Sequence, residues 1–597
     1  MSELLSGWKR TAYCTEFTTA DAGREVTLMG WTNVRRDLGA LVFVQLRDRT
    51  GVMQVVFSSE TLSKDDFDRA CTIRSEYVLA VRGKLTLRTG NMVNPSMKTG
   101  ELEVLVEEFK ILSTSETPPF EISDDCNANE LLRLKYRYLD LRRPEMQKNL
   151  MMRHKISFLA REYFDRQGFL EIETPILTKS TPEGARDYLV PSRVHPGKFY
   201  ALPQSPQLFK QLLMLSGYDR YFQIARCFRD EDLRADRQPD FTQIDLEMSF
   251  VEEEDVLSVN EGFLKRLFKE TLDVDVALPL PQLKYADAMA RYGSDKPDTR
   301  FGLELCDISD AVKNSEFSVF RGAVERGGSV RAINVKGASG SFSRKEIDAL
   351  GEFVKTYRAK GLAWMNYKAE GIASPILKFL KDDEVAAIEK LTGFEQGDIL
   401  FIVADSDKTV FASLGALRLK LADKLKLIPE HQYNLLWVRE FPQFEWSEEE
   451  NRYMAMHHPF TSPMDEDMDK LETDPGNVRA KAYDIVLNGV EIGGGSIRIH
   501  SQELQKRMFR ALGFTDEQAQ YRFGFLMDAF RYGPPPHGGM AYGLDRLAML
   551  ISGTSSIRDV IAFPKVQNAS CPMTGAPDFV DDKQLDELHV TCTEKEE

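Results

Sequence analysis

The sequence predicts a multidomain protein of the α+β class, and three observations lead to this prediction. The chain has 597 residues, which corresponds to about four domains at roughly 150 residues each. Its first 115 residues contain short alternating segments typical of strands, whereas helical and strand patterns are mixed further along. Residues 296–427 form an α/β segment between two stretches of similar composition, so we expect it to be inserted into one larger domain.

Composition excludes several classes of protein. Hydrophobic residues make up 42% and charged residues 28% of the chain, as in ordinary globular proteins. No apolar run approaches the roughly 18 residues that a membrane helix needs, and the first residues lack the pattern of a signal or transit peptide. We therefore expect a cytoplasmic protein without a membrane partner.

Charge and cysteine content add two further expectations. The net charge of −16 argues against a protein that coats nucleic acid, but it does not exclude a local basic surface. The seven cysteines are scattered without a CxxC pair or zinc spacing. We therefore expect reduced, buried thiols and no zinc site.

Residues 1–115 are expected to form a small β-barrel. Five β-like runs are separated by Gly, Asn and Asp turns, at residues 26–32, 41–47, 52–57, 77–81 and 101–106. Five short strands are typical of the OB-fold, a small barrel. A fragment of a β-sandwich is the alternative.

Residues 116–146 are predicted to be a linker or hinge, because they are polar and marked by prolines. Within them, residues 131–143 carry five basic residues and one acid, interleaved with aromatic residues and leucines. Two interpretations stay open for this segment: a solvated amphipathic helix, or a hinge that contacts a polyanion.

The larger domain is assigned to residues 147–295 and 428–570, and it begins with a long helix over about 147–167. In the inserted segment the pattern predicts strands at 330–335, 362–367 and 398–403, and helices at 344–360, 382–391 and 412–425. Residues 571–597 are assigned to an acidic tail, which we expect to be loose because its last 21 residues contain eight acids and two lysines.

Two segments of the larger domain carry candidate phosphate-binding chemistry. Arg229 and Phe241 bracket a charged loop between two strand-like runs. A guanidinium can bind phosphate through two hydrogen bonds, and an aromatic ring can stack on a base. Further along, Gly543 permits close backbone approach, and Arg546 lies in the first turn of a predicted helix, where phosphate is favoured. Structural ion pairing is the alternative for both arginines.

These segments, together with Pro175 after a long helix, resemble the three ordered motifs of the class II aminoacyl-tRNA synthetases. The runs 181–188, 204–210, 228–245 and 488–500 are similar, more narrowly, to the bacterial-type aspartyl-tRNA synthetases of class IIb. An insertion between the second and third motifs is also characteristic of that family. The resemblance covers nearly the full chain except the acidic tail. It implies an N-terminal OB-fold, a catalytic domain built on an antiparallel sheet, and an inserted α/β domain.

The resemblance also implies an activity. Members of that family form aspartyl-adenylate and pyrophosphate from L-aspartate and ATP, and then transfer the aspartyl group to the 3′ end of tRNA-Asp. This chemistry depends mainly on positioning and charge stabilisation, which agrees with the absence of a nucleophile–His pair. The family further implies Mg²⁺, and a homodimer that forms through the motif 1 helices.

The resemblance assigns roles to individual residues around ATP. Arg229 is implied to hold the α-phosphate and Arg546 the γ-phosphate, which makes them the candidate catalytic residues. Phe241 is implied to stack under adenine. The rest of the implied ATP-binding set consists of Asp230, Glu231, Gln238, Glu491, Gly543, Leu544 and Asp545.

Two acids are implied to bind the metal ion. Asp484 and Glu491 lie on either side of Asn488-Gly489, which predicts a hairpin turn. Mg²⁺ prefers one or two carboxylates together with substrate oxygens. Exposed hairpin acids without a ligand are the alternative.

An aspartate substrate carries a side-chain carboxylate, so its pocket needs buried positive charge. Arg498 and Lys210 match the family residues that supply it, and Asp245 is implied to orient them or to contact the substrate ammonium. The remaining implied aspartate-binding residues are Glu183, Ser205, Gln207, Arg229 and His457. A plain structural role for His457 or for the adjacent His458 stays open.

In the barrel, Arg36, Phe43 and Gln54 match the residues with which the family contacts the anticodon. Strand parity puts Phe43 opposite the uniformly apolar residues of its run, which favours an exposed stacking face over a place in the core. Leu38 occupies a position where relatives that also charge tRNA-Asn often carry histidine. This favours an enzyme restricted to tRNA-Asp, with charging of tRNA-Asn as the alternative.

Three other functions stay open. A class IIb synthetase for lysine is opposed by the charges of Arg498 and Lys210, and one for asparagine by the insertion. A non-catalytic RNA-binding paralogue would be expected to have lost Arg229, Glu491 or Arg546, and all three are present. An OB-fold protein for single-stranded DNA would leave most of the chain unexplained, so we expect no DNA partner.

Overall fold

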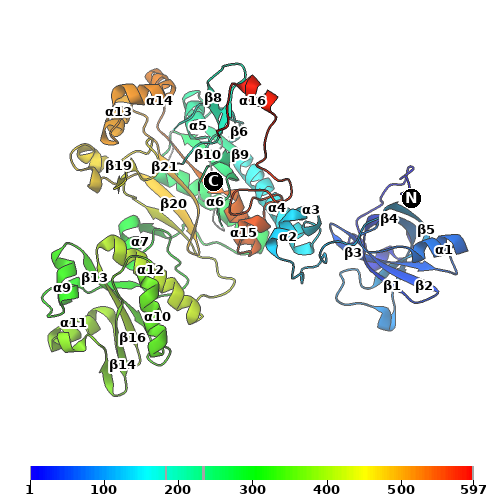
Figure 1. The fold of residues 1–597 in the computed structure, drawn as a ribbon, viewed down its shortest axis with the longest axis horizontal. Coiled ribbons are helices and arrows are strands. Elements are labelled where there is room, and N and C mark those ends of the chain that lie inside the picture. Colours follow the sequence, from blue (N-terminus) through cyan, green and yellow to red (C-terminus); the bar gives the residue numbers. More distant parts are fainter. Residues whose placement is uncertain (1, 182–184, 232–235, 594–597) are drawn as a thin grey trace. The chain divides into compact units, whose positions relative to one another are not determined.

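The structure is a computed structural model that describes residues 2–181, 185–231 and 236–593. The chain divides into two compact units (Figure 1). The first contains the residues up to His154 and Ser552–Phe579, and the second contains most of Lys155–Ile551 and the residues after Phe579. No helix within the described ranges has the length and apolar character to cross a membrane.

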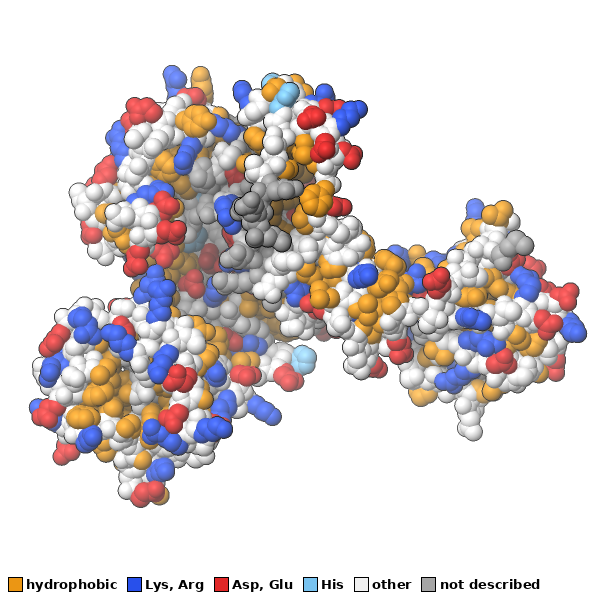
Figure 2. Space-filling view, in the orientation of Figure 1, with side chains coloured by type: hydrophobic (Ala, Val, Ile, Leu, Met, Phe, Trp, Pro, Cys, Tyr) orange, Lys and Arg blue, Asp and Glu red, His pale blue; other side chains and the backbone are white. Residues whose placement is uncertain are grey.

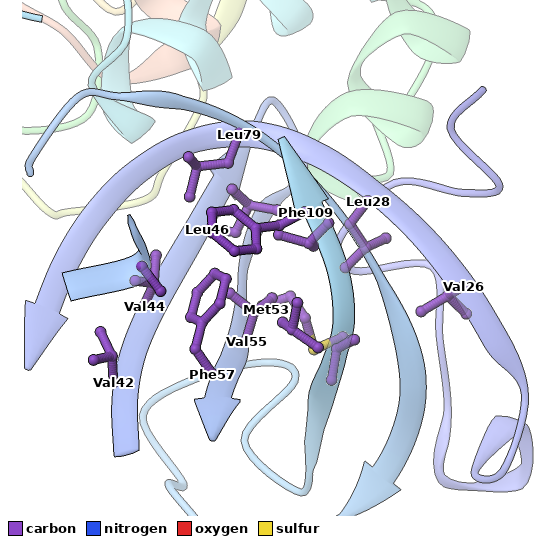
Figure 3. Close-up of a cluster of buried hydrophobic side chains, with 14 of the residues drawn as sticks. Val26, Leu28, Val42, Val44, Leu46, Met53, Val55, Phe57, Leu79 and Phe109 are labelled. Atoms are coloured by element: carbon purple, nitrogen blue, oxygen red, sulfur yellow. The ribbon is translucent and has the colours of Figure 1, made fainter. Parts of the chain in front are cut away.

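The N-terminal part of the first unit is a closed five-stranded barrel with strand order β1-β2-β3-β5-β4. Its strands are β1 (Glu25–Asp37), β2 (Leu41–Asp48), β3 (Gly51–Ser58), β4 (Val78–Leu87) and β5 (Leu102–Ser113). All five predicted runs are therefore strands, and the closed barrel excludes the sandwich fragment. Alternate residues of β2 point into the barrel, where Val42, Val44 and Leu46 are fully buried (Figure 3).

Part of the basic segment of the first unit is buried, whereas Leu131 and Tyr138 of the same segment are exposed. The segment forms two short helices, α2 (Glu130–Lys135) and α3 (Arg137–Asp140). Arg137 is 2% exposed and donates hydrogen bonds to the backbone oxygens of Arg558, Ile561 and Ala562. Arg137 and Arg143 both pair with the buried Asp140. These arginines hold together distant parts of the chain, so they are neither solvated nor available to a polyanion.

The second unit is built on an eight-stranded, mainly antiparallel sheet with strand order β11-β17-β20-β21-β22-β10-β9-β6. In chain order its strands are β6 (Leu170–Glu171), β9 (Arg220–Phe228), β10 (Asp240–Ser249), β11 (Gln282–Lys284), β17 (Leu435–Arg439), β20 (Ala482–Leu487), β21 (Val490–Ile497) and β22 (His537–Gly543). Only the two edge pairs, β6–β9 and β11–β17, are parallel. This is the antiparallel catalytic sheet that the resemblance implied.

Helices cover this sheet and frame its central strands. The helices that matter below are α4 (Pro144–Arg166), α5 (Gln207–Leu215), α6 (Glu253–Leu272), α7 (Tyr285–Tyr292), α13 (Gln502–Ala511), α14 (Asp516–Ala529) and α15 (Leu544–Ser552). Helix α6 packs on one face of the central strands: Phe263 contacts the Tyr542 ring, and the Tyr542 hydroxyl donates to Asn260. Because side chains alternate along a strand, residues adjacent to Tyr542 face the opposite side.

The inserted segment forms its own antiparallel five-stranded sheet, with order β12-β13-β16-β14-β15. Its strands are β12 (Leu305–Asp307), β13 (Ser329–Val335), β14 (Ala363–Lys368), β15 (Gly371–Ala373) and β16 (Ile399–Asp405). Helices α8 (Ser309–Val312), α9 (Ser318–Glu325), α10 (Arg344–Lys355), α11 (Asp382–Thr392) and α12 (Asp407–Lys424) form two separate apolar cores with the sheet. The three predicted strands and three predicted helices are present, although the first of these helices ends at Lys355 rather than 360.

Two smaller predictions were only partly right. None of the seven cysteines, all within the described ranges, forms a disulfide, but only Cys14, Cys227 and Cys571 are buried. The acidic tail contains a short helix, α16 (Asp582–Leu588), so it is not loose throughout. Figure 2 shows acidic and basic side chains interspersed on the visible surface, so the negative net charge does not form one field over that face.

Candidate active site

The face of the sheet opposite helix α6 carries a row of charged side chains. On β10, Asp245 and Glu247 alternate with the buried Ile244 and Leu246, so both acids point away from α6. Glu247 pairs with Gly539 of β22 in the ladder. A Cβ on Gly539 would collide with the Glu247 carboxylate. The glycine therefore makes room for a charge inside the sheet.

Four charges on this face form a buried cluster, with Lys210, Asp245, Glu247 and Arg498 each at most 2% exposed. Lys210 Nζ lies 2.7 Å from Asp245 Oδ1 and 3.3 Å from Glu247 Oε2. Arg498 donates to both oxygens of Glu247, at 2.9 and 3.1 Å. Buried charges must be paired to be tolerated, and here two cations and two anions balance.

The pKa values of Asp245 and Glu247 are shifted in opposite directions. Burial raises the pKa of Asp245, and the charge of Lys210 offsets only part of that rise. Burial acts in the same direction on Glu247, but Arg498 and Lys210 outweigh it and hold the pKa of Glu247 below its ordinary value. Asp245 Oδ2 accepts no hydrogen bond among the described residues. The Glu247 carboxylate is therefore fully paired within the protein, whereas Asp245 Oδ2 can still accept a hydrogen bond from a ligand.

The two adjacent histidines have different neighbours. His458 Nε2 lies 2.8 Å from Arg498 Nη1, and because a guanidinium only donates, this nitrogen is the acceptor. Burial and the Arg498 charge lower the pKa of His458 well below its ordinary value, so the ring is neutral. His457 instead lies 3.6 Å from Asp484. The histidine in contact with the buried arginine is thus His458, while the implied contact of His457 with the substrate stays a prediction.

The β9–β10 hairpin carries the predicted base- and phosphate-binding pair. The Arg229 guanidinium carbon lies 5.1 Å from the centre of the Phe241 ring, and the Arg229 backbone N–H donates to Pro239 O. Arg229 Nε is buried and has no hydrogen-bond partner in the described part of the chain. A buried cationic donor without a partner over an aromatic ring is suited to an anionic, flat ligand such as a nucleotide.

The other predicted residues of this hairpin lie near arginines or are buried. Glu231 forms an ion pair with Arg237 at 2.8 Å, and Asp230 lies 3.9 Å from Arg186. Gln238 is buried at the base of the loop. The charge alternation seen in the sequence is therefore partly surface ion pairing, as the alternative interpretation held, while Arg229 is not paired in this way.

The predicted third motif lies next to this hairpin, because β22, which leads into α15, pairs directly with β10. Arg546, in the first turn of α15, donates to the backbone oxygen of Glu491 at 2.7 Å. Asp545 accepts a hydrogen bond from the Thr242 backbone N–H, and Leu544 is 2% exposed. The side chains of these two predicted ATP-binding residues are thus used in packing, which leaves Gly543 and Arg546 as the parts of the motif that can contact a ligand.

The two predicted metal ligands lie on paired strands, Asp484 on β20 and Glu491 on β21. Asn488 and Gly489 form the predicted turn, with φ angles of 52° and 83°, between β20 and β21. Burial and then the charge of Asp484 raise the pKa of Glu491. Two carboxylates that repel each other in this way are a suitable donor set for a divalent cation.

Two predicted aspartate-binding residues, Ser205 and Gln207, lie beside the charge cluster and are not part of it. Ser205 lines a neighbouring cavity of about 280 Å³ together with Thr178, Asp187 and Gln204. The Gln207 side chain donates to Gln211, whose own amide lies 3.2 Å from His537. Glu183 falls outside the described residues.

The three predicted anticodon residues of the barrel lie together. Arg36, Phe43 and Gln54 line one cavity of about 500 Å³. Phe43 is half-buried on the outer face of β2, as strand parity predicted, and Gln54 donates to Glu103 at 2.7 Å. Leu38, 71% exposed, lines the same cavity. An open, partly basic surface with an aromatic ring is suited to single-stranded nucleic acid.

Sequence reasoning missed three residues that contact Arg498: Glu247, His458 and Ser496. A signal for Glu247 was present, because an acid two residues after Asp245 in a strand must share its face. The same signal was present for Ser496, two residues before Arg498, whereas nothing local to His458 indicates its contact.

Comparison with known proteins gives consistent results. Residues 129–567 match the family model described as tRNA synthetases class II (D, K and N), and residues 26–112 match the OB-fold nucleic acid binding domain. The chain is 61% identical, over the full length of both proteins, to the aspartate–tRNA ligase of Ruminiclostridium cellulolyticum. It is 60% identical, over 99% of both, to the aspartate–tRNA(Asp/Asn) ligase of Caldanaerobacter subterraneus.

A solved structure shares the fold at lower identity. The asparaginyl-tRNA synthetase of Pyrococcus horikoshii in complex with asparaginyl-adenylate superposes with a TM-score of 0.58 and 18% identity. The match covers 93% of this chain and 98% of the other. At this identity the similarity concerns the fold alone.

Proposed function

Because the chain belongs to the class II tRNA synthetases of the aspartate, lysine and asparagine group, we propose that it is an aspartate–tRNA ligase. The enzyme activates L-aspartate with ATP and transfers the aspartyl group to the 3′ end of tRNA-Asp. The observation that carries the proposal is the buried pair of cations, Lys210 and Arg498, on the face of the sheet opposite α6. The full-length relatives named as aspartate–tRNA ligases support it.

Selection of aspartate follows from the contacts of Arg498. Its Nε and Nη2 are bonded to Glu247, whereas its Nη1 contacts only neutral groups, His458 Nε2 and Ser496 Oγ. A substrate carboxylate can replace these neutral partners and gain charge-assisted hydrogen bonds. An asparagine amide brings no charge, so it gains less. Asp245 Oδ2 is the proposed acceptor for the substrate ammonium.

The first chemical step needs placement more than proton transfer. An α-carboxylate oxygen of aspartate attacks the α-phosphorus of ATP; the new O–P bond forms, the bond to the bridging oxygen breaks, and pyrophosphate leaves with the electron pair. Negative charge grows on the α-phosphate oxygens, where Arg229 would stabilise it. Phe241 would stack under adenine, and Arg546 would hold the γ-phosphate. Glu231, Gln238 and the Gly543 backbone complete the proposed nucleotide contacts.

Asp484 and Glu491 are the proposed ligands of Mg²⁺. The repulsion that raises the pKa of Glu491 would be relieved by a cation, and two carboxylates are a donor set that Mg²⁺ accepts together with phosphate oxygens. When bound, the ion would neutralise phosphate charge. We expect a chelator to abolish aspartate-dependent exchange and added Mg²⁺ to restore it; activity that survives chelation would exclude this assignment.

In the second step, a hydroxyl of the terminal tRNA adenosine attacks the aspartyl carbonyl, and AMP leaves. We propose that Arg36, Phe43 and Gln54 of the barrel contact the anticodon and so select the tRNA. Leu38, in the same cavity, favours tRNA-Asp alone. Charging of both tRNA-Asp and tRNA-Asn is the second candidate, because a relative 60% identical to the chain carries that name.

We also propose a homodimer in the cytoplasm. Several large apolar side chains on α4 and on the segments around β6 to β8 are about half exposed: Phe158, Leu170, Ile176, Leu177, Leu189 and Phe199. Such surfaces in a protein without membrane helices commonly belong to interfaces between subunits. Light scattering after size-exclusion chromatography should give twice the mass of one chain, and a monomer at micromolar concentration would contradict the dimer.

The decisive experiment for the function is ATP–pyrophosphate exchange with a panel of aspartate, asparagine, glutamate and lysine. We expect exchange with aspartate and, because the pocket selects a short carboxylate by charge, little with the other three. Failure with aspartate, or equal activity with asparagine, would overturn the proposal. Exchange without transfer to tRNA would show that only the second step is absent.

A further inference from the structure

The segment that enters the inserted domain lies against the hairpin that carries the proposed metal ligands. After α7 the chain continues through residues 294–302 to β12. Asp298 is buried against the β20–β21 turn: its Cβ lies 3.0 Å from where a Cβ on Gly489 would be. Thr299 accepts a hydrogen bond from the Asn434 side chain at 3.4 Å. The entry segment and the hairpin are therefore in direct contact.

This contact brings Lys296 to the edge of the site. Lys296 lies two residues before Asp298, and Glu491 lies two residues after Gly489, so each is within about 7 Å of the contact along its own chain. Arg546 of α15 donates to the backbone oxygen of Glu491. Arg546 and Lys296 are thus two cations on the elements that contact the β20–β21 hairpin.

The Lys296 side chain is exposed, and its ammonium forms no ion pair with any acid in the described ranges. Arg546, by comparison, is held by the Glu491 backbone oxygen. A lysine ammonium is a compact charge on a long flexible stem and a common phosphate ligand. We infer that Lys296 is a further phosphate-binding residue, which contacts the pyrophosphate portion of ATP and the pyrophosphate that leaves. This inference rests on the proposed ligase function.

The inserted domain fixes the backbone from which Lys296 projects. Arg418 of α12 is 2% exposed, and its Nη2 donates to the backbone oxygens of Asp298, Phe301 and Gly302 at 2.8 to 2.9 Å. Its guanidinium carbon also lies 4.1 Å from the centre of the Phe301 ring. Arg300 pairs with Asp298 at 2.7 Å. The backbone that carries Lys296 is therefore held by Arg418 on one side and lies against the β20–β21 turn on the other, so the exposed side chain starts from a fixed point beside the proposed nucleotide site.

The test compares Lys296→Met and Lys296→Arg with Lys313→Met, a matched change at an exposed lysine of the inserted domain that pairs with Asp310. In ATP–pyrophosphate exchange, we expect Lys296→Met to raise the KM for ATP and the KM for pyrophosphate roughly tenfold, as loss of one charge-assisted contact would. The KM for aspartate should stay within twofold, Lys296→Arg should recover most of the affinity, and Lys313→Met should match the unaltered chain.

Equilibrium binding gives a second measurement that does not depend on turnover. The dissociation constant of ATP should rise roughly tenfold in Lys296→Met while that of AMP, which lacks the pyrophosphate portion, stays unchanged. Unchanged ATP and pyrophosphate constants would overturn the inference. An equal loss for ATP, AMP and aspartate would also overturn it, because that pattern indicates a structural role.

A measurement on the unaltered chain avoids dependence on folding of the variant. Acetylation of individual lysines by acetic anhydride can be followed by peptide mass spectrometry. We expect ATP, but not AMP, to slow acetylation of Lys296 several-fold, with Lys313 unaffected. Equal acetylation of Lys296 with and without ATP would overturn the inference. A chain that shows no aspartate-dependent exchange but protects Lys296 with ATP would overturn the proposed ligase and leave the phosphate contact standing.

Discussion

The buried charge cluster of the sheet and the outer face of the barrel are both suited to charged ligands, but in opposite ways. In the cluster, Lys210, Asp245, Glu247 and Arg498 are at most 2% exposed and are paired with one another. On the barrel, Phe43 is half-buried and Arg36 is exposed beside an open cavity. The charge cluster is buried and pre-organised, whereas the outer face of the barrel is exposed to solvent.

The difference reflects the size of the ligand that each region is proposed to bind. A small acid can be enclosed, so its charge can be selected where water does not screen it, and each partner must then be placed precisely in advance. A polymer cannot be enclosed, so its bases are stacked and its phosphates attracted at a screened surface. We therefore expect added salt to weaken tRNA binding strongly and aspartate binding little.

The largest expected effect is that of Arg498→Leu. The change removes the partner of the substrate carboxylate and leaves Glu247 buried without its main counter-ion, a loss on the order of 3–5 kcal/mol for a buried pair. The kcat/KM for aspartate in exchange should therefore fall by roughly 150- to 5,000-fold. Arg510→Leu, at an exposed arginine that pairs with Asp516, is the control and should have little effect. Unchanged aspartate kinetics in Arg498→Leu would move the specificity site elsewhere.

A smaller effect is expected from Glu247→Gln, which keeps the shape but removes one charge of the cluster. We expect kcat/KM for aspartate to fall roughly ten- to a hundredfold, because Arg498 loses a charge-assisted partner. The pH dependence of the folding stability should also change in this variant. The folded pKa of Glu247 lies below the ordinary 4.5, so its contribution is present above pH 4.5 and is lost as pH falls through the lowered value.

Thermal unfolding between pH 7 and pH 3 tests whether the contribution of Glu247 to stability is lost as the pH falls. The difference in Tm between the unaltered chain and Glu247→Gln should be largest at neutral pH and should shrink on acidification. A difference that grows as the pH falls would mean that Glu247 is not held as a carboxylate by Arg498 and Lys210.

On the barrel, Phe43→Ala should reduce tRNA charging while leaving exchange intact. Loss of one stacked base corresponds to about 1–3 kcal/mol, or roughly a five- to 150-fold higher KM for tRNA-Asp. Leu87→Ala, at an exposed residue of β4, serves as the matched control. If exchange and charging fall together in Phe43→Ala, the proposal that the barrel only binds tRNA while the sheet carries out activation is wrong.

The smallest effect is expected at the edge of the same cavity. Leu38→His adds a hydrogen-bonding ring where the side chain is 71% exposed, so stability should not change measurably. We expect charging of tRNA-Asn to rise a few-fold relative to tRNA-Asp. Efficient charging of tRNA-Asn by the unaltered chain would instead show that Leu38 does not restrict the enzyme.

Much of the fold could be predicted from local patterns. Alternation identified all five barrel strands and the outward position of Phe43, and helical periodicity located the main helices of the inserted domain. The turn at Asn488 followed from residues that tolerate positive φ. The buried contacts of Arg137 were not predicted, because charge composition does not reveal that backbone oxygens more than four hundred residues away accept its hydrogen bonds.

The candidate site was predictable to a similar extent. Residue types and motif order indicated Arg229 and Phe241, and the family resemblance implied Lys210 and Arg498. Neither indicated that Glu247 and His458 complete the surroundings of Arg498, or that the segment carrying Lys296 contacts the β20–β21 turn. Those contacts join residues that are far apart in the chain, so no local pattern carries them.

The sequence by itself thus determined which segments become strands and helices, and which residue types are available for phosphate, base and carboxylate recognition. Those properties depend on neighbours along the chain. Only the tertiary structure decided which charges are buried together and which histidine contacts Arg498. The sheet brings β10, β21 and β22 side by side, and only there does burial make each unpaired charge costly enough to require a specific partner.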